Sequence, residues 1–152
     1  MLSSQRRFLK QRIVMKVIDL DGTVSHWKLT GEVVRGRDSR KRSQLHLKAR
    51  DLLKELYPAL QIIEEIPIQL KRSQRASLDF YINTIKTVIE VHGEQHYKFN
   101  TFYHSSRQDF INQKKRDNDL KEWCEINNMT YVELPFNEGE EQWKSRITHP
   151  SD

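Results

Sequence analysis

Cysteine is almost absent from this 152-residue chain, which contains only Cys124. A single cysteine excludes an intrachain disulfide framework and a four-cysteine zinc site. The apolar runs are far shorter than the ~20 residues that cross a bilayer, and basic residues interrupt the N-terminal apolar stretch, unlike in a signal peptide. We therefore expect no membrane partner and a cytoplasmic protein, located in the host cell if a phage encodes it.

Acidic residues are scarce in the first third of the chain. Residues 1–50 hold 13 Lys and Arg against 4 Asp and Glu, whereas residues 77–152 hold 9 against 13. Lys and Arg supply the salt-dependent affinity for phosphates that nucleic-acid-binding proteins need. A basic arm joined to a carboxylate-bearing body favours nucleic acid as the partner over ordinary surface solvation.

The hydrophobic pattern predicts an α+β or α/β core in which helices flank a mixed central sheet. Ser43 is the expected N-cap of the first helix, and Asp21-Gly22 the expected turn of an N-terminal hairpin. We predict this hairpin at 13–30, helices at 44–57 and 105–127, and strands at 61–70, 78–82, 87–92 and 129–136. The predicted units are a hairpin and basic arm (1–42), a core (43–137) and a polar tail (138–152), in which Trp143 docks back.

The stretch ASLDFYINTIKTVIEVHGEQHYKF, residues 76–99, is the expected site of chemistry. Two β-rich runs flank Asn83-Thr84, which predicts a hairpin. Side chains alternate along a strand, so Val88, Glu90 and His92 share one face and Ile89 and Val91 the other. A fold about residues 83–85 places Asp79 opposite residue 89 or 90, so we expect Asp79, Glu90 and His92 to converge.

Two neighbouring carboxylates repel one another unless a cation lies between them, and carboxylate oxygens select hard ions such as Mg²⁺. We therefore expect Asp79 and Glu90 to hold Mg²⁺, for which Mn²⁺ substitutes. His92, with an ordinary pKa near ~6.5, is suited to take a proton from polarised water. Together these groups outline phosphodiester hydrolysis.

Asp79, Glu90-Val91-His92 and the adjacent Gly93-Glu94-Gln95-His96 resemble the PD-(D/E)xK nuclease superfamily. The similar branch is that of the very short patch repair endonuclease and related phage homing endonucleases, in which a His replaces the usual Lys. The resemblance covers residues 43–137 and extends to QKKRDNDLKEWCEINNMTYVELPFN. It implies a restriction-endonuclease-like core.

The resemblance also implies supporting roles for three further side chains. Asp117 matches the acidic helix position and would act through His92 or His96, and the alternative is a salt bridge with Arg107 or Lys121. His46 stands where the first helix of such nucleases often carries Glu, and Glu65 is the other candidate for this acid. His92 and His96 are four residues apart, but Gly93 and the preceding strand argue against a zinc pair on a helix. We therefore expect His96 to orient a phosphate or leaving group.

Basic residues and one aromatic residue form the expected DNA-contacting set. A β-ribbon can enter the major groove, although a purely structural hairpin fits the sequence equally well. The set lies in the hairpin, the arm and the loop before the catalytic hairpin: Trp27, Lys28, Arg35, Arg37, Arg40, Lys41, Arg42, Lys71, Arg72 and Arg75. The aromatic residues at 97–104 fit either the core or stacking on bases.

These features predict a Mg²⁺-dependent, site-specific DNA endonuclease that acts on double-stranded DNA. The resemblance implies a phage-type homing endonuclease, which would need a homodimer to cut both strands. Two alternatives stay open: a mismatch- or damage-directed nicking endonuclease, and an inactive nucleic-acid-binding module with the same fold.

Overall fold

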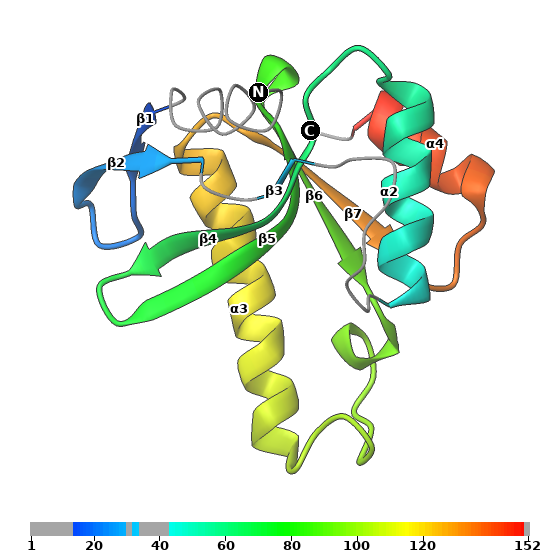
Figure 1. Ribbon diagram of the computed structural model, residues 1–152. Coiled ribbons are helices and arrows are strands. Elements are labelled where there is room, and N and C mark those ends of the chain that lie inside the picture. Colours follow the sequence, from blue (N-terminus) through cyan, green and yellow to red (C-terminus); the bar gives the residue numbers. More distant parts are fainter. Residues whose placement is uncertain (1–13, 30–31, 34–42, 151–152) are drawn as a thin grey trace.

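The computed structural model describes residues 14–29, 32–33 and 43–150 (Figure 1). The elements follow the order β1 (Val14–Ile18), β2 (Val24–Lys28), β3 (Glu32–Val33), α2 (Gln44–Leu56), β4 (Ile63–Lys71), β5 (Gln74–Ile82), η1 (Asn83–Ile85), β6 (Thr87–His92), η2 (Glu94–His96), α3 (Arg107–Ile126), β7 (Thr130–Pro135) and α4 (Glu140–Thr148). The predicted α+β class, with helices flanking a mixed sheet, is confirmed.

The central sheet of the described chain has the strand order β3-β4-β5-β6-β7. Neighbouring strands are antiparallel except β6 and β7, which run parallel. Parallel neighbours need a long crossover connection, and here α3 supplies it. The carboxyl ends of β6 and β7 therefore lie at the same edge of the sheet, where η2 begins.

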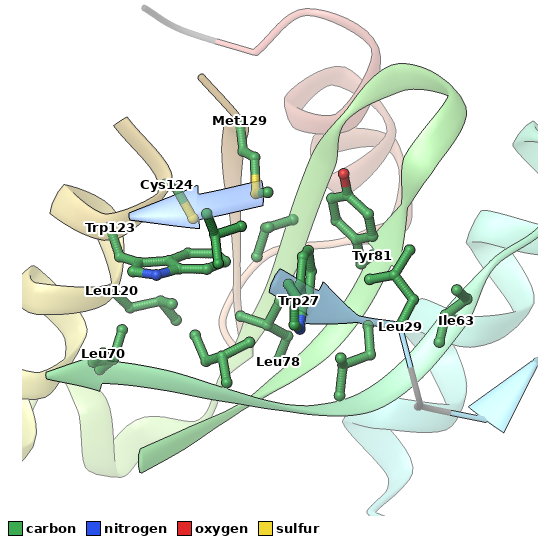
Figure 2. Close-up of a cluster of buried hydrophobic side chains, with 14 residues drawn as sticks. Trp27, Leu29, Ile63, Leu70, Leu78, Tyr81, Leu120, Trp123, Cys124 and Met129 are labelled. Carbon is green, nitrogen blue, oxygen red and sulfur yellow. The ribbon is translucent and has the colours of Figure 1, made fainter. Parts of the chain in front are cut away.

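One core cluster lies between the sheet, α3 and the β1–β2 hairpin (Figure 2). Trp27 from β2 contacts Tyr81 and Trp123, with ring centroids 5.1 and 5.6 Å apart. Trp27 is only 6% exposed, so the prediction that it contacts DNA is wrong, because its ring belongs to the core. The hairpin packs on the body, as an isolated hairpin must to be stable.

A second core cluster lies on the other face of the sheet, beneath α2 and α4. The predicted helix at 44–57 is confirmed, with Ser43 Oγ capping it by accepting from the His46 backbone N–H. The predicted polar tail is wrong in part, because residues 140–148 form α4. Trp143 is fully buried and donates from Nε1 to the Pro135 carbonyl at 2.8 Å, so α4 is part of the core.

Two turns differ from the sequence prediction. The β1–β2 loop spans five residues, since Ile18 pairs with Val24, and Gly22 adopts the positive φ (83°) that glycine tolerates. The basic stretch after β4 is a tight turn rather than a loop, because Gln74 already pairs with Lys71. In the described part of the chain, no helix has the length and apolar character needed to cross a membrane.

Candidate active site at the fork between β5 and β6

In the pairing of β5 with β6, Ile82 lies opposite Thr87 and Phe80 lies opposite Ile89. Beyond this last pair the two strands diverge (Figure 1). This register places Asp79 opposite Glu90, as the sequence predicts. The Asp79 backbone N–H donates to Glu90 Oε2 at 2.6 Å, and the Val91 N–H donates to Asp79 Oδ2 at 2.8 Å. Each carboxylate thus uses one oxygen to close the fork.

The strand geometry is irregular at Asp79. Leu78 and Phe80 are two residues apart, yet they pack in different core clusters, so the usual alternation of side chains breaks between them. On the neighbouring strand Glu65 has a positive φ of 53°, a conformation that costs a non-glycine residue free energy. The irregularity accompanies the fork and sets the direction of the Asp79 side chain.

Burial makes the negative charges at the fork costly. It raises the pKa of the Glu90 carboxyl well above its ordinary value, and the neighbouring Asp79 carboxylate raises it further. Burial also raises the pKa of Asp79, although the hydrogen bond from the Val91 N–H opposes this shift. A divalent cation would stabilise both charged forms. The donor set therefore fits the hard-cation site predicted from the sequence.

A stacked pair of imidazoles lies next to these carboxylates. The rings of His92 and His96 are nearly parallel (11°), with centroids 4.0 Å apart. His96 Nδ1 is 2.9 Å from Asp117 Oδ2, and its Nε2 is 3.3 Å from the Gln113 side-chain nitrogen. Of the predicted partners for Asp117, the structure brings His96 to it, and Gln113 contacts the other ring nitrogen of His96.

His92 has both ring nitrogens engaged. Nδ1 lies 3.3 Å from Glu133 Oε1 and Nε2 lies 3.3 Å from the Tyr131 hydroxyl. The ligand atoms of His92, His96 and Asp117 lie within 4.8 Å of one another, a spacing compatible with a metal. However, nearly parallel stacked rings hold their nitrogen lone pairs in two separate planes rather than directing them at one point. The observed arrangement is that of a hydrogen-bonded cluster.

Glu133 is a site residue that the sequence analysis missed. Its pKa is lowered to about 2, first by the hydrogen bond from His92, and also by that from Tyr97. The Tyr97 hydroxyl donates to Glu133 Oε2 at 2.7 Å, and Lys121 Nζ lies 3.6 Å from Oε1. Glu133 pairs in register with Glu90 on β6. The position of Glu133 beside Glu90 depends on β6 and β7 being neighbouring strands, and the sequence does not reveal that pairing.

His46 approaches the fork from α2. A pocket of about 390 Å³ has His46 and Asp79 in its wall, together with residues around Gly93 and the side chains of Tyr103 and Phe136. The acid beside His46 is Glu64, whose Oε2 is 3.4 Å from His46 Nε2. Glu65, the alternative acid considered from the sequence, is exposed and lies outside this pocket wall.

The structure describes only part of the predicted DNA-contacting set. Arg35, Arg37, Arg40, Lys41 and Arg42 lie outside the described residues, and Lys28 is exposed. The turn bearing Lys71, Arg72 and Arg75 lies across α3 from η2 in Figure 1, so the structure does not bring it to the fork. Lys71 pairs with Asp119 at 3.3 Å.

Two exposed features lie next to residues of the site. The sequence analysis did not select the run Lys114-Lys115-Arg116, which is exposed on α3 directly before Asp117. For the aromatic stretch at 97–104, the sequence left open core packing and stacking on bases, and its residues differ in burial. His104 is buried, whereas Phe102 and Tyr103 are 83% and 53% exposed.

The fold and site define the protein as an α+β protein with a carboxylate–histidine centre at a strand fork. The chain is similar to uncharacterized protein 307L of Invertebrate iridescent virus 6, with 37% identity over 59 residues, and to uncharacterized protein 033L of Invertebrate iridescent virus 3, with 34% over 59. Uncharacterized protein 094L of Frog virus 3 is 35% identical over 60 residues.

Each match covers 39% of this chain, and 30%, 30% and 39% of the respective viral proteins. The chain thus spans well under half the length of the curated relatives that it matches. No protein-family model matches the chain, and no solved structure gives a significant match.

Proposed function

We propose that this protein is a metal-dependent endonuclease that hydrolyses phosphodiester bonds in DNA. The observation that carries the proposal is the fork, where Asp79 and Glu90 are held side by side next to a histidine–carboxylate pair. Buried carboxylates with raised pKa values are costly for the fold, and such perturbed groups concentrate at functional sites. A bound divalent cation would explain why the two carboxylates are buried side by side.

In this proposal Asp79 and Glu90 bind the cation, Mg²⁺ or Mn²⁺. Bound there, the cation supplies Lewis-acid stabilisation of the charge that develops on the phosphate. Asp117 holds His96 through Nδ1, so His96 Nε2, which contacts Gln113, is the nitrogen that would accept a proton from water. This assignment differs from our expectation for His92, because the His92 side chain is only 4% exposed whereas that of His96 is 18% exposed.

His92 instead supports the site. Its ring covers one face of the His96 ring, and Glu133 and Tyr131 fix its orientation from β7. Fixing a catalytic imidazole in this way reduces the reorganisation needed during reaction. His92 is therefore a positioning residue in the proposed mechanism.

The finer class follows from the motif resemblance. The restriction-endonuclease-like core is proposed from the motif resemblance alone. For a phage- or virus-type endonuclease acting inside the host cell, the viral relatives support the origin and not the activity. We propose that the basic arm at 35–42 and the exposed run at 114–116 contact DNA phosphates. A homodimer would cut both strands, and a monomer would nick one.

Sequencing the ends produced from a library of randomised DNA duplexes tests the proposal. The purified protein is incubated with Mg²⁺ or Mn²⁺, beside Asp79→Asn and a control, Glu55→Gln, which alters an exposed acid on α2. We expect new ends from the wild type and the control, and none from Asp79→Asn. DNA binding without cutting in any metal would instead identify an inactive nucleic-acid-binding module. Ends confined to one strand at mismatches would identify a nicking enzyme.

A further inference from the structure

Three ionisable side chains are buried together behind the α2 wall of the pocket. Glu64 on β4 is 1% exposed, and Arg50 and His46 on α2 are 6% and 8% exposed. Glu64 Oε2 lies 3.4 Å from His46 Nε2 and 3.6 Å from Arg50 Nε. Burying such a set seldom stabilises a fold relative to apolar side chains of similar volume. The cluster therefore calls for a reason other than stability.

His46 is the member of this cluster that reaches the pocket, and its ring is held firmly. The Ser43 cap fixes its backbone, and the ring stacks on Phe80 with centroids 4.5 Å apart and planes inclined by 24°. Glu64 fixes the ring rotation through Nε2. His46 belongs to the pocket wall, and because Nε2 faces Glu64, we assign Nδ1 as the nitrogen offered to a molecule in the pocket.

The charges around His46 suit an anionic group. Glu64 Oε2 lies 3.4 Å from His46 Nε2 and 3.6 Å from Arg50 Nε, so one buried carboxylate holds both side chains. An imidazole with hydrogens on both nitrogens donates from Nε2 to Glu64 and has Nδ1 to donate to a ligand. Asp79 lies in the same pocket wall, so a phosphate bound near the proposed cation would come within reach of Nδ1.

We propose that His46 hydrogen-bonds an oxygen of the scissile phosphate and that Glu64 is its positioning residue. This inference rests on the proposed nuclease function and deepens it. The inference assigns a site residue to α2, the helix whose first turn contains no acid. His46 from α2 and His96, held by α3, would then approach the phosphate from the two helical layers that flank the sheet.

A double-mutant cycle tests the inference, with the rate of DNA cleavage in Mn²⁺ as the readout. We expect His46→Gln to lower kcat by about 100-fold, as for loss of a donor to a transition-state oxygen. Glu64→Gln should lower it by about 10-fold in the wild-type background and have no further effect in His46→Gln. The control His149→Gln, at an exposed histidine, should cleave at the wild-type rate.

A merely structural Glu64 would give a different result, because Glu64→Gln would then lower the rate by the same factor in both backgrounds. That outcome, or wild-type rates for both single variants, would overturn the inference while leaving the nuclease function intact. Absence of cleavage by the wild-type protein would instead refute the proposed function.

A second measurement does not depend on activity. Side-chain ¹⁵N NMR of the wild-type protein should show hydrogen on His46 Nε2 in the neutral imidazole and loss of this preference in Glu64→Gln. Hydrogen on Nδ1 alone would show that Nε2 does not donate to Glu64, and this would contradict the positioning role.

Discussion

Replacing Glu90 with glutamine should stabilise the metal-free protein and abolish its response to metal. Glutamine has nearly the shape of glutamate and keeps a side-chain oxygen to accept the Asp79 N–H, which is 2.6 Å from Glu90 Oε2. The fork can therefore stay closed in Glu90→Gln. The variant loses only a buried negative charge beside Asp79.

The sign and size of the effect follow from the raised pKa of Glu90. Because the folded-state pKa lies above the ordinary 4.5, the folded protein holds this proton more tightly than the unfolded chain. This stabilising contribution is full below pH 4.5 and is lost as the pH rises through the raised pKa. Where the pH exceeds this raised pKa, the wild type bears the full cost of the Glu90 charge, so Glu90→Gln should gain about 1–2 kcal/mol at the upper end of the pH range.

Thermal unfolding in EDTA at pH 5 to 8 measures this difference. For a chain of this size, a gain of 1–2 kcal/mol raises Tm by about 2–8 °C. The advantage of Glu90→Gln should shrink as the pH falls toward 5. Mg²⁺ at ten times its Kd should stabilise the wild type by about 1.4 kcal/mol and leave the variant unchanged. A variant that is less stable at pH 8, or that Mg²⁺ stabilises as much as the wild type, would refute the reasoning.

Three further predictions concern other parts of the molecule. Asp117→Asn should lower kcat at least 10-fold with Tm nearly unchanged, because His96 loses its charged partner, and a wild-type rate would exclude the proposed pair. Trp143→Ala should cost about 3–5 kcal/mol in urea unfolding, whereas a loss below 1 kcal/mol would show that α4 is not part of the core. Alanine at all of 114–116 should weaken DNA binding and reduce its salt slope, while Lys144→Ala leaves both unchanged, and equal slopes for the two variants would contradict a phosphate contact.

The main elements were predictable because their signals are local. The apolar stripe and the Ser43 cap predict α2, and β-rich runs predict β4 to β7. Helix α4 was missed because its sequence is rich in Glu and its N-cap, Gly139, has no capping side chain. Trp143 and Ile147, four residues apart, were the available signal. The β4–β5 turn was missed because residues 71–74 contain neither Gly nor Asn.

The candidate site was predictable only where short connections fix the register. Counting across the η1 turn places Asp79 opposite residue 89 or 90, and the hydrogen bond from the Asp79 N–H to the Glu90 carboxylate shows that Glu90 is its neighbour. Glu133 could not be found in this way, because the parallel β6–β7 pairing is set by a long crossover. The choice of Glu64 over Glu65 depends on the positive φ of Glu65, which interrupts the alternation of side chains and cannot be read from the sequence.

Cleavage of a labelled DNA duplex by wild-type protein and Asp79→Asn, each with and without Mn²⁺, tests the central claim most directly. The account predicts cleavage only by the wild type and only with Mn²⁺, while both proteins bind the duplex with similar affinity. Equal cleavage by both proteins, or cleavage by the wild type in EDTA, would contradict it.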